Sequence, residues 1–179
     1  MKLETERLVI RDMLQSDWEH VHSYSSLPEV AKYASWGPNT EEDTHQYIHH
    51  VLTQQQQSPR NAYELAVCIK DQDLMIGSVA IFIEKTNAEL GYVLHPEHHG
   101  KGYATEAAMA LLDYGFNTLG VHRVFATCRP ANRASEQVMK RIGMQREGLL
   151  REHWHFKGAY HDSLLYSILA SEYGRSPVE

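Results

Sequence analysis

One segment of the sequence restricts the fold more than any other, because it joins two strand patterns by a helix. Residues 88–94 ("AELGYVL") and 123–128 ("RVFATC") read as strands, and between them lie a glycine-containing turn and a long helical pattern. A strand–helix–strand unit pairs its strands in parallel, so the sheet contains at least one parallel pair. The small residues of the helix recur at helical spacing and predict a closely packing face: Ala104, Ala107, Ala108, Leu111, Leu112 and Gly115.

The remaining strand patterns are joined by short turns and predict antiparallel hairpins. "AYELAVCI" and "MIGSVAIFIE" flank the turn "KDQD", and "REGLLREHWHF" and "DSLLYSILASEY" flank "KGAYH". The strand "RLVIRDM" precedes two helices, one capped by Ser16 and one starting near Thr40, and "NRASEQVMKRIG" is a helix that ends at Gly143. We predict an α+β fold with a mixed, mostly antiparallel sheet of seven strands, a central parallel pair and about four flanking helices.

Composition narrows the class of function. The chain has 179 residues with no internal repeat, so we expect one domain, 1–179. Its 17 basic and 23 acidic residues give a net charge of −6, which disfavours nucleic acid and anionic membranes as partners. No apolar run approaches the roughly 20 residues of a membrane span, and none resembles a signal peptide, so we expect a cytoplasmic protein. Cys68 and Cys128 are expected to be buried free thiols, with a catalytic cysteine as the alternative.

The turn "HPEHHGKGYATEA" (95–107) is the main candidate for a ligand site. It does not match a Walker A loop, and as a dinucleotide fingerprint it begins with Gly100 and Gly102 but has Thr105 where a third glycine is required. A glycine turn at a helix start still presents backbone N–H groups and the positive end of the helix dipole to an anion. A helix start without a ligand is one alternative, and a metal bound by the three histidines of the turn is another.

These residues resemble a known family. "YVLHPEHHGKGYATEA" resembles the acetyl-CoA-binding signature of the GNAT superfamily of N-acetyltransferases, R/Q-x-x-G-x-G/A, with His99 in the first position and Ala104 in the last. "CRPANRASEQVMKRIGM", "GLLREHWHFKGAYHDSLLYSIL" and the opening "LETERLVIRDM" are similar to the RimJ/RimL branch, named for acetylation of ribosomal-protein N-termini. The resemblance covers nearly the whole chain and implies a GNAT-like fold with acetyl-CoA as the acetyl donor.

The resemblance also implies where acetyl-CoA binds. It places the pantetheine in a cleft where the two parallel strands splay apart, and the pyrophosphate on the backbone amides of the glycine turn. The chain departs from the signature in its first position, where histidine replaces the usual long side chain. The cofactor-binding residues implied in this way are Leu94, His99, Gly100, Lys101, Gly102, Tyr103, Ala104 and Asn132.

A proton donor for the departing thiolate is implied as well. Many GNAT members use a tyrosine seven residues after the asparagine of this region, but that position is Met139 here. The RimJ/RimL branch uses the serine three residues after the asparagine, which is Ser135. Asn132 then caps the helix, contacts the cofactor, or does both.

For the general base, which deprotonates the acceptor amine, we choose Glu89, at the start of the strand that lines the cleft and acting through water. Some members of the branch carry a base glutamate in the penultimate strand. That position is Trp154 here, with Glu152, His153 and His155 close by. Water alone is a third alternative, for an amine whose pKa is lowered.

The sequence therefore predicts an enzyme that transfers an acetyl group from acetyl-CoA to a primary amine by direct attack in a ternary complex. The amine belongs to a protein N-terminus, as in RimJ/RimL-type enzymes, or to a small molecule such as a polyamine, an antibiotic or a metabolite. A CoA-binding sensor without turnover is the alternative from another class. We expect no resident metal, and a homodimer is compatible with the sequence. Candidate acceptor contacts are Trp36, Trp154, Tyr160 and Asp162.

Overall fold

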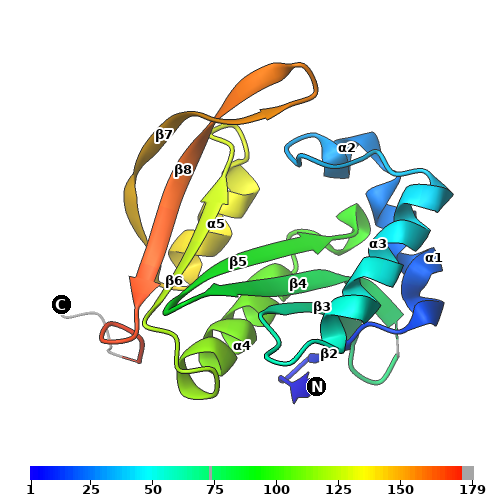
Figure 1. Cartoon of the computed structure of the whole chain (residues 1–179), viewed down its shortest axis with the longest axis horizontal. Helices are drawn as coiled ribbons and strands as arrows, with labels where there is room; N and C mark the ends of the chain where they lie inside the picture. The colour runs from blue at the N-terminus through cyan, green and yellow to red at the C-terminus, as the bar shows by residue number, and fades with distance from the viewer. Residues whose placement is uncertain (73, 175–179) are drawn as a thin grey trace.

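Figure 1 shows the computed structural model, which describes residues 1–72 and 74–174. Within these residues, eight strands form one sheet in the order β1-β2-β3-β4-β5-β6-β8-β7. The strands are β1 (Lys2–Glu4), β2 (Leu8–Asp12), β3 (Ala62–Ile69), β4 (Leu74–Glu84), β5 (Asn87–Leu94), β6 (Arg123–Cys128), β7 (Gln145–Phe156) and β8 (Ala159–Leu169). The helices are α1 (Trp18–Ser25), α2 (Pro28–Ala31), α3 (Glu41–Gln55), α4 (Tyr103–Asn117) and α5 (Arg133–Arg141), with short 3₁₀ turns at Gln15–Asp17 and Pro96–His98.

The predicted α+β fold with a mixed, mostly antiparallel sheet is confirmed, but the predicted number of seven strands is wrong. The additional strand is β1, whose residues pair with β2 through contacts such as Leu3↔Ile10. Three residues are too few to show a strand period in the sequence. The described chain also has five α-helices rather than about four, because a single helical turn, α2, begins at Pro28.

The first helix starts later than predicted. Ser16 is not its N-cap but lies in the 3₁₀ turn, and α1 begins at Trp18. The carboxylate of Asp17 holds this turn, because it accepts hydrogen bonds from the Leu14 backbone N–H (2.8 Å) and from the Arg11 guanidinium (2.7 and 2.9 Å). The contact of Asp17 with Arg11 of the preceding strand therefore decides where the helix begins.

Two other helix ends agree with the sequence. Thr40 is the N-cap of α3, and its hydroxyl accepts a hydrogen bond from the Asp43 N–H (3.1 Å) while the Asp43 carboxylate accepts one from the Thr40 N–H (2.9 Å). Gly143, with φ of 86°, follows the end of α5. These ends are set by residues close in sequence, so local patterns suffice to find them.

Helices cover both faces of the sheet, as Figure 1 shows. Along β3, Leu65 and Val67 belong to the hydrophobic cluster that includes α4, whereas Ala66 and Cys68 belong to the cluster that includes α1 and α3. The small-residue face of α4 is buried as predicted, and a Cβ at Gly115 would lie only 3.0 Å from Ile81 Cδ1. Cys68 and Cys128 are buried thiols outside any disulfide, also as predicted.

No helix in the described part of the chain has both the length and the apolar character that crossing a bilayer requires.

The parallel pair of the sheet, β5 and β6, stays together for a short distance only. Asn87–Glu89 pair with Arg123–Phe125, and the pairing ends there. Beyond that point β5 follows β4 up to Leu94, and β6 follows β8 up to Cys128. The two strands therefore diverge toward their C-terminal ends, as Figure 1 shows. The splayed parallel pair implied by the family resemblance is present.

Gly77 in β4 permits the close approach of β5 near its end. A Cβ at this position would lie 2.2 Å from the Val93 carbonyl oxygen and 2.7 Å from Leu94 Cα. We expect Gly77→Ala to push the two strands apart and to lower the free energy of unfolding by about 1–3 kcal/mol, as overpacked sites do. Urea denaturation measures the loss.

Gly148→Ala is the matched control, because a Cβ there would have no neighbour within 4 Å. Equal stability of Gly77→Ala and the wild type would contradict the expectation.

Candidate active site

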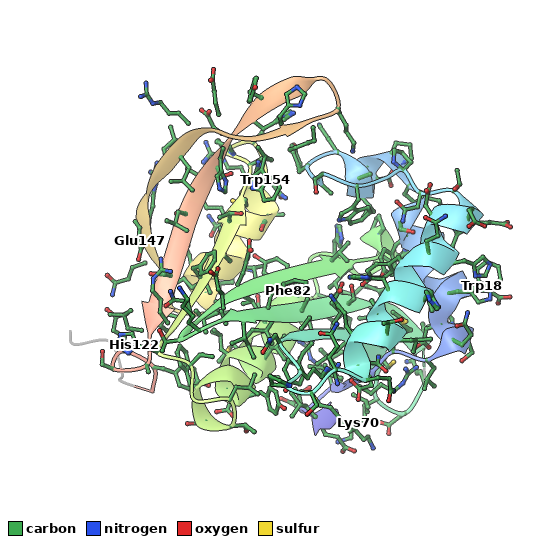
Figure 2. The ribbon with its side chains drawn as sticks, in the orientation of Figure 1. Trp18, Lys70, Phe82, His122, Glu147 and Trp154 are labelled. Atoms are coloured by element: carbon green, nitrogen blue, oxygen red, sulfur yellow. The ribbon has the colours of Figure 1, made fainter. Side chains whose placement is uncertain are left out.

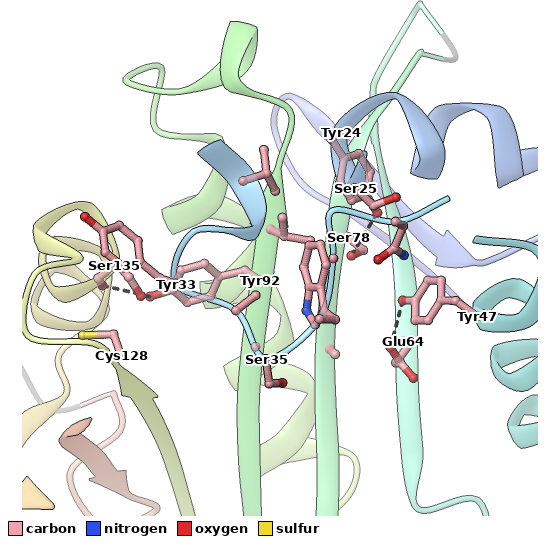
Figure 3. A pocket seen from close by; sticks show the side chains of 18 of the residues that line it. Tyr24, Ser25, Tyr33, Ser35, Tyr47, Glu64, Ser78, Tyr92, Cys128 and Ser135 are labelled. Atoms are coloured by element: carbon pink, nitrogen blue, oxygen red, sulfur yellow. Dashed lines mark hydrogen bonds between the residues drawn. The ribbon is translucent and has the colours of Figure 1, made fainter. Parts of the chain in front are cut away.

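A pocket of about 930 Å³ lies where β5 and β6 diverge. Residues 89–93 of β5 and 126–128 of β6 line it, together with parts of α1, α3, α5 and the loop that follows α2. Figure 3 shows the pocket from close by. Of the predicted site residues, Glu89, Asn132 and Ser135 line this pocket, and so do Trp36 and Trp154.

Ser135 lies in the first turn of α5, which Asn132 caps. The Asn132 side-chain oxygen accepts a hydrogen bond from the Ser135 backbone N–H (3.2 Å), so the predicted capping by Asn132 is present. The Ser135 hydroxyl lies 3.0 Å from the hydroxyl of Tyr92, which also donates to the Ser135 carbonyl oxygen (2.9 Å; Figure 3). Burial raises the pKa of Tyr92, so this hydroxyl stays protonated at neutral pH. The sequence does not reveal Tyr92, because a tyrosine in an apolar strand pattern reads as a core residue.

Glu136, the residue after Ser135, fixes α5 to the sheet. It is buried, and its carboxylate accepts hydrogen bonds from Lys140 (2.9 Å) and from the Tyr166 hydroxyl of β8 (2.8 Å). The bond from Lys140, followed by those from Tyr166 and Arg133, lowers the pKa of Glu136 to about 2. The ionised carboxylate therefore connects the helix that carries Ser135 to the strand that pairs with β6.

Glu89 lies in β5 at the last residue that pairs with β6. It is half-buried, and the loss of solvent raises its pKa above the ordinary value of 4.5.

Among the alternatives in the penultimate strand, Trp154 lines the pocket and Glu152 does not. Glu152 has a φ of 49° at an irregularity of β7, and its backbone N–H donates to Asp162 (2.8 Å). The His153 ring nitrogen lies 2.8 Å from the Ser163 hydroxyl. Glu89 is the predicted base with the better position.

The glycine turn has the conformation that its residues suggest. Gly100 and Gly102 have φ of 73° and 84°, values that disfavour a side chain, and Gly102 is the N-cap of α4. The amides that follow, at the start of the helix, have no acceptor within it. Arg7 holds the turn from the N-terminal segment, donating to the Lys101 carbonyl oxygen (2.9 Å) and to Glu106 (2.7 Å). The turn is therefore an exposed, clamped N-terminus suited to an anion.

The histidines of the turn make local contacts. The His99 Nε2 atom lies 2.9 Å from the Leu94 carbonyl oxygen at the end of β5, and the His95 Nδ1 atom accepts a hydrogen bond from the Glu97 N–H (3.3 Å). In the described residues, no group of three His, Cys, Asp or Glu side chains is arranged to hold a metal ion. His99 instead links the turn to β5, so the short side chain in this position has a structural use.

The edge of β5 and the start of α4 have the properties needed to bind acetyl-CoA at the residues that the family resemblance implies. Beyond Glu89, no described strand pairs with the edge of β5 that faces β6, which leaves backbone groups near Leu94 for strand-like pairing with pantetheine. The N-terminus of α4 suits the pyrophosphate, and at Gly100 a Cβ would meet no atom within 4 Å, so the turn is open to a ligand.

A second group of polar side chains, buried or half-buried, lies in the pocket, and the sequence does not single it out. The Glu64 carboxylate of β3 accepts a hydrogen bond from the Tyr47 hydroxyl (2.8 Å), and the Tyr24 hydroxyl donates to Ser78 (3.4 Å). Burial raises the pKa of Glu64. Figure 3 shows this group apart from the Ser135 and Tyr92 pair. The pocket thus has one end with two hydroxyls and another that is acidic and aromatic.

The predicted acceptor contacts are only partly brought together. Trp36 and Trp154 line the pocket and are 39% and 48% exposed, whereas Tyr160 and Asp162 are not among the lining residues. At the tip of the β7–β8 hairpin, the Lys157 ammonium donates to the Ala31 carbonyl oxygen (2.5 Å) and to that of Trp36 (3.2 Å). The tip of the hairpin lies near the α2 region, as Figures 1 and 2 show, and residues of both segments line the pocket.

His99→Ala tests the contact between the turn and β5. We expect the Kd for acetyl-CoA to rise about 3–10-fold, because one hydrogen bond contributes about 0.5–1.5 kcal/mol. Calorimetry with purified protein measures the change. His122→Ala replaces an exposed histidine outside the turn and serves as the control. An unchanged Kd would show that the His99 side chain has no part in donor binding.

Comparison with known proteins gives a consistent result. Residues 7–145 match the family model described as an acetyltransferase (GNAT) domain. An uncharacterized N-acetyltransferase of Bacillus subtilis (strain 168), YnaD, is 37% identical over 175 residues, which cover 97% of this chain and 99% of YnaD.

Solved structures show the same fold. A GNAT-family acetyltransferase from Bacillus anthracis has a TM-score of 0.86 at 35% identity, covering 96% of this chain and 100% of that one. RimL, a ribosomal L7/L12 alpha-N-protein acetyltransferase in complex with coenzyme A, has a TM-score of 0.83 at 21% identity, covering 94% of this chain and 98% of that one. The likeness to RimL is one of fold, and it agrees with the resemblance seen in the sequence.

Proposed function

The chain belongs to the GNAT acetyltransferases, and from that premise we propose that its pocket transfers an acetyl group from acetyl-CoA to a primary amine by direct attack in a ternary complex. As a member of this family it is an acetyl-CoA-dependent N-acetyltransferase. The observation that carries the proposal is the position of Ser135, Tyr92 and Glu89 in one pocket between the diverging strands.

Acetyl-CoA supplies an acetyl group activated as a thioester. The glycine turn and the end of β5 hold the donor, with His99–Ala104 and Leu94 as its contacts. Cys128 lines the same pocket, but burial raises the pKa of its thiol to about 11. The thiol therefore stays protonated at neutral pH and does not compete with the acceptor amine as a nucleophile.

Ser135 donates a proton to the thiolate that leaves when the carbon–sulfur bond breaks. The Tyr92 hydroxyl, 3.0 Å away, orients the serine and is itself protonated. The cap from Asn132 and the anchor through Glu136 fix the helix turn on which the serine stands. Because these contacts exist without a ligand, the donor hydroxyl is positioned before the substrates bind.

Glu89 accepts the proton of the acceptor amine, directly or through a water. A primary amine is mostly protonated at neutral pH and must lose a proton before it attacks. The raised pKa of Glu89 makes it a stronger base than an exposed glutamate.

Two acceptor classes follow from the sequence: a protein N-terminus and a small-molecule amine. The bonds from Lys157 join the β7–β8 hairpin to the α2 region, and residues of both segments line the pocket, which favours a small molecule. The acidic, aromatic end with Glu64 and Tyr47 is suited to an ammonium group. A CoA sensor remains the alternative without catalysis, and turnover decides between them.

Ser135→Ala and Tyr92→Phe test the proton donor. We expect Ser135→Ala to lower kcat by about 100-fold or more, because a positioned general acid contributes about 10²–10⁴-fold, while acetyl-CoA affinity stays within about twofold. Tyr92→Phe should lower kcat by less, because the tyrosine only orients the serine. Release of free CoA with a panel of amines gives kcat, and calorimetry gives the affinity.

Ser171→Ala, which removes an exposed serine, is the control. An undiminished kcat in Ser135→Ala would refute the assignment. If the wild type binds acetyl-CoA but acetylates no amine of the panel, the sensor is the correct function.

Glu89→Gln tests the base through pH. Since burial raises the pKa of Glu89, the kcat/KM of the wild type should fall as pH decreases through a value above 4.5, where the carboxylate takes up a proton. The glutamine variant should lose this limb and most of its activity at neutral pH. Profiles of kcat/KM from pH 5 to 9 measure both. A limb that persists in Glu89→Gln would assign the base elsewhere.

A further inference from the structure

Arg129, directly after β6, is a charged residue of the pocket that the proposed reaction does not use. Among the described residues that line the pocket, it is the only lysine or arginine, beside the carboxylates of Asp43, Glu64 and Glu89. Its Nη1 atom is buried and has no hydrogen-bond partner within residues 1–72 and 74–174. A buried cationic N–H group without an acceptor is unfavourable, so the site lacks an anion that would satisfy it.

Neighbouring groups hold Arg129 in place without neutralising it. Its guanidinium carbon lies 5.8 Å from the centre of the Phe156 ring. Asp162 acts on Arg129 through charge alone, and its carboxylate accepts a hydrogen bond from the Glu152 backbone N–H instead. Burial, followed by the nearby charge of Arg129, lowers the pKa of His153, and a histidine carries no negative charge that could neutralise Arg129.

The donor site does not account for Arg129. The residues implied for the pyrophosphate, 100–104, are not among those that line this pocket. That turn has cations of its own, since Arg7 donates to the carbonyl oxygen of Lys101. Arg129 instead follows Cys128, on the strand that diverges from β5, and lines the pocket in which we place the acetyl transfer.

We propose that Arg129 binds an anionic group of the acceptor, which is therefore a small primary amine that also carries a carboxylate or a phosphate, as an amino acid does. This inference rests on the proposed function. A guanidinium donates two parallel hydrogen bonds to either anion, while Glu89 and Glu64 remain for the ammonium group. A polyamine offers no partner for Arg129, and a peptide N-terminus has a neutral amide in place of the carboxylate.

Matched acceptor pairs test the proposal in the full-length enzyme. One arm compares glycine, alanine and phenylalanine with their amides, and the other compares O-phosphoethanolamine with ethanolamine. We expect the anionic member of at least one arm to have a kcat/KM about tenfold higher or more, the usual effect of a hydrogen bond to a charged group. The arm that shows the preference identifies the anion.

Two variants assign the preference to Arg129. Arg129→Gln should reduce it to about twofold or less, mainly through KM, and Arg129→Lys should restore part of it. Arg151→Gln changes the charge equally at an exposed position of β7 outside the pocket and should leave the preference intact. Spermidine and a neutral peptide with a free N-terminus serve as acceptors without the anion.

A binding measurement keeps the inference testable if no amine is acetylated, the result that would refute the proposed function. N-acetylphenylalanine and its amide are titrated into the protein while the fluorescence of Trp36 and Trp154, both in the pocket, is followed. Tighter binding of the acid by the wild type, lost in Arg129→Gln, supports the anion site even without turnover.

The inference is overturned if the wild type makes no distinction between acids and amides in either assay, or if Arg129→Gln retains the preference. It is also overturned if Arg129→Gln weakens acetyl-CoA binding and leaves the preference unchanged, because Arg129 would then belong to the donor site. Efficient acetylation of spermidine or the peptide, unaffected by Arg129→Gln, has the same consequence.

Discussion

The short parallel pairing of β5 and β6 is the constraint on which the rest of the structure depends. Three residues of each strand pair, and then each strand follows its antiparallel neighbour away from the other. One edge of β5 is left without a strand partner, and a pocket lies between the strands. In a continuous sheet, this edge would be paired with β6 and no space would remain for the pocket. The donor and acceptor sites that we propose for this acetyltransferase are therefore consequences of where the pairing stops.

The elements around the pocket are held by contacts that do not involve a ligand. Glu136 joins α5 to β8, Arg7 clamps the glycine turn, and Lys157 joins the final hairpin to the α2 region. Each contact connects segments that are distant in the sequence. These contacts fix the positions of the hydroxyl pair, the glycine turn and the β7–β8 hairpin before substrates bind. The free-energy cost of ordering these segments on binding is therefore lower.

Local patterns predicted much of the fold, and the failures have a common cause. The face of α4, the cap at Thr40 and the end at Gly143 depend on neighbouring residues, and all are present. The strand β1 and the start of α1 depend on pairing with β2 and on Arg11, so the sequence pattern missed the first and misplaced the second. In the site, motifs and the family resemblance pointed to Ser135 and Glu89. They did not indicate Tyr92, Glu64 or Arg129, whose residue types have many uses elsewhere in a protein.

The sequence by itself determined the strand–turn–helix–strand unit and its glycine turn, because hydrophobic period and glycine conformation act over a few residues. It also placed Ser135 after a capping asparagine in the first turn of a helix. Only the tertiary structure decided that Tyr92 meets Ser135 and that Glu64 meets Tyr47. The same holds for Arg129, which lines this pocket with its Nη1 atom buried and, among the described residues, without a hydrogen-bond partner. These contacts join different elements of the sheet and helices, and their energies depend on distance and burial, which are properties of the folded chain alone.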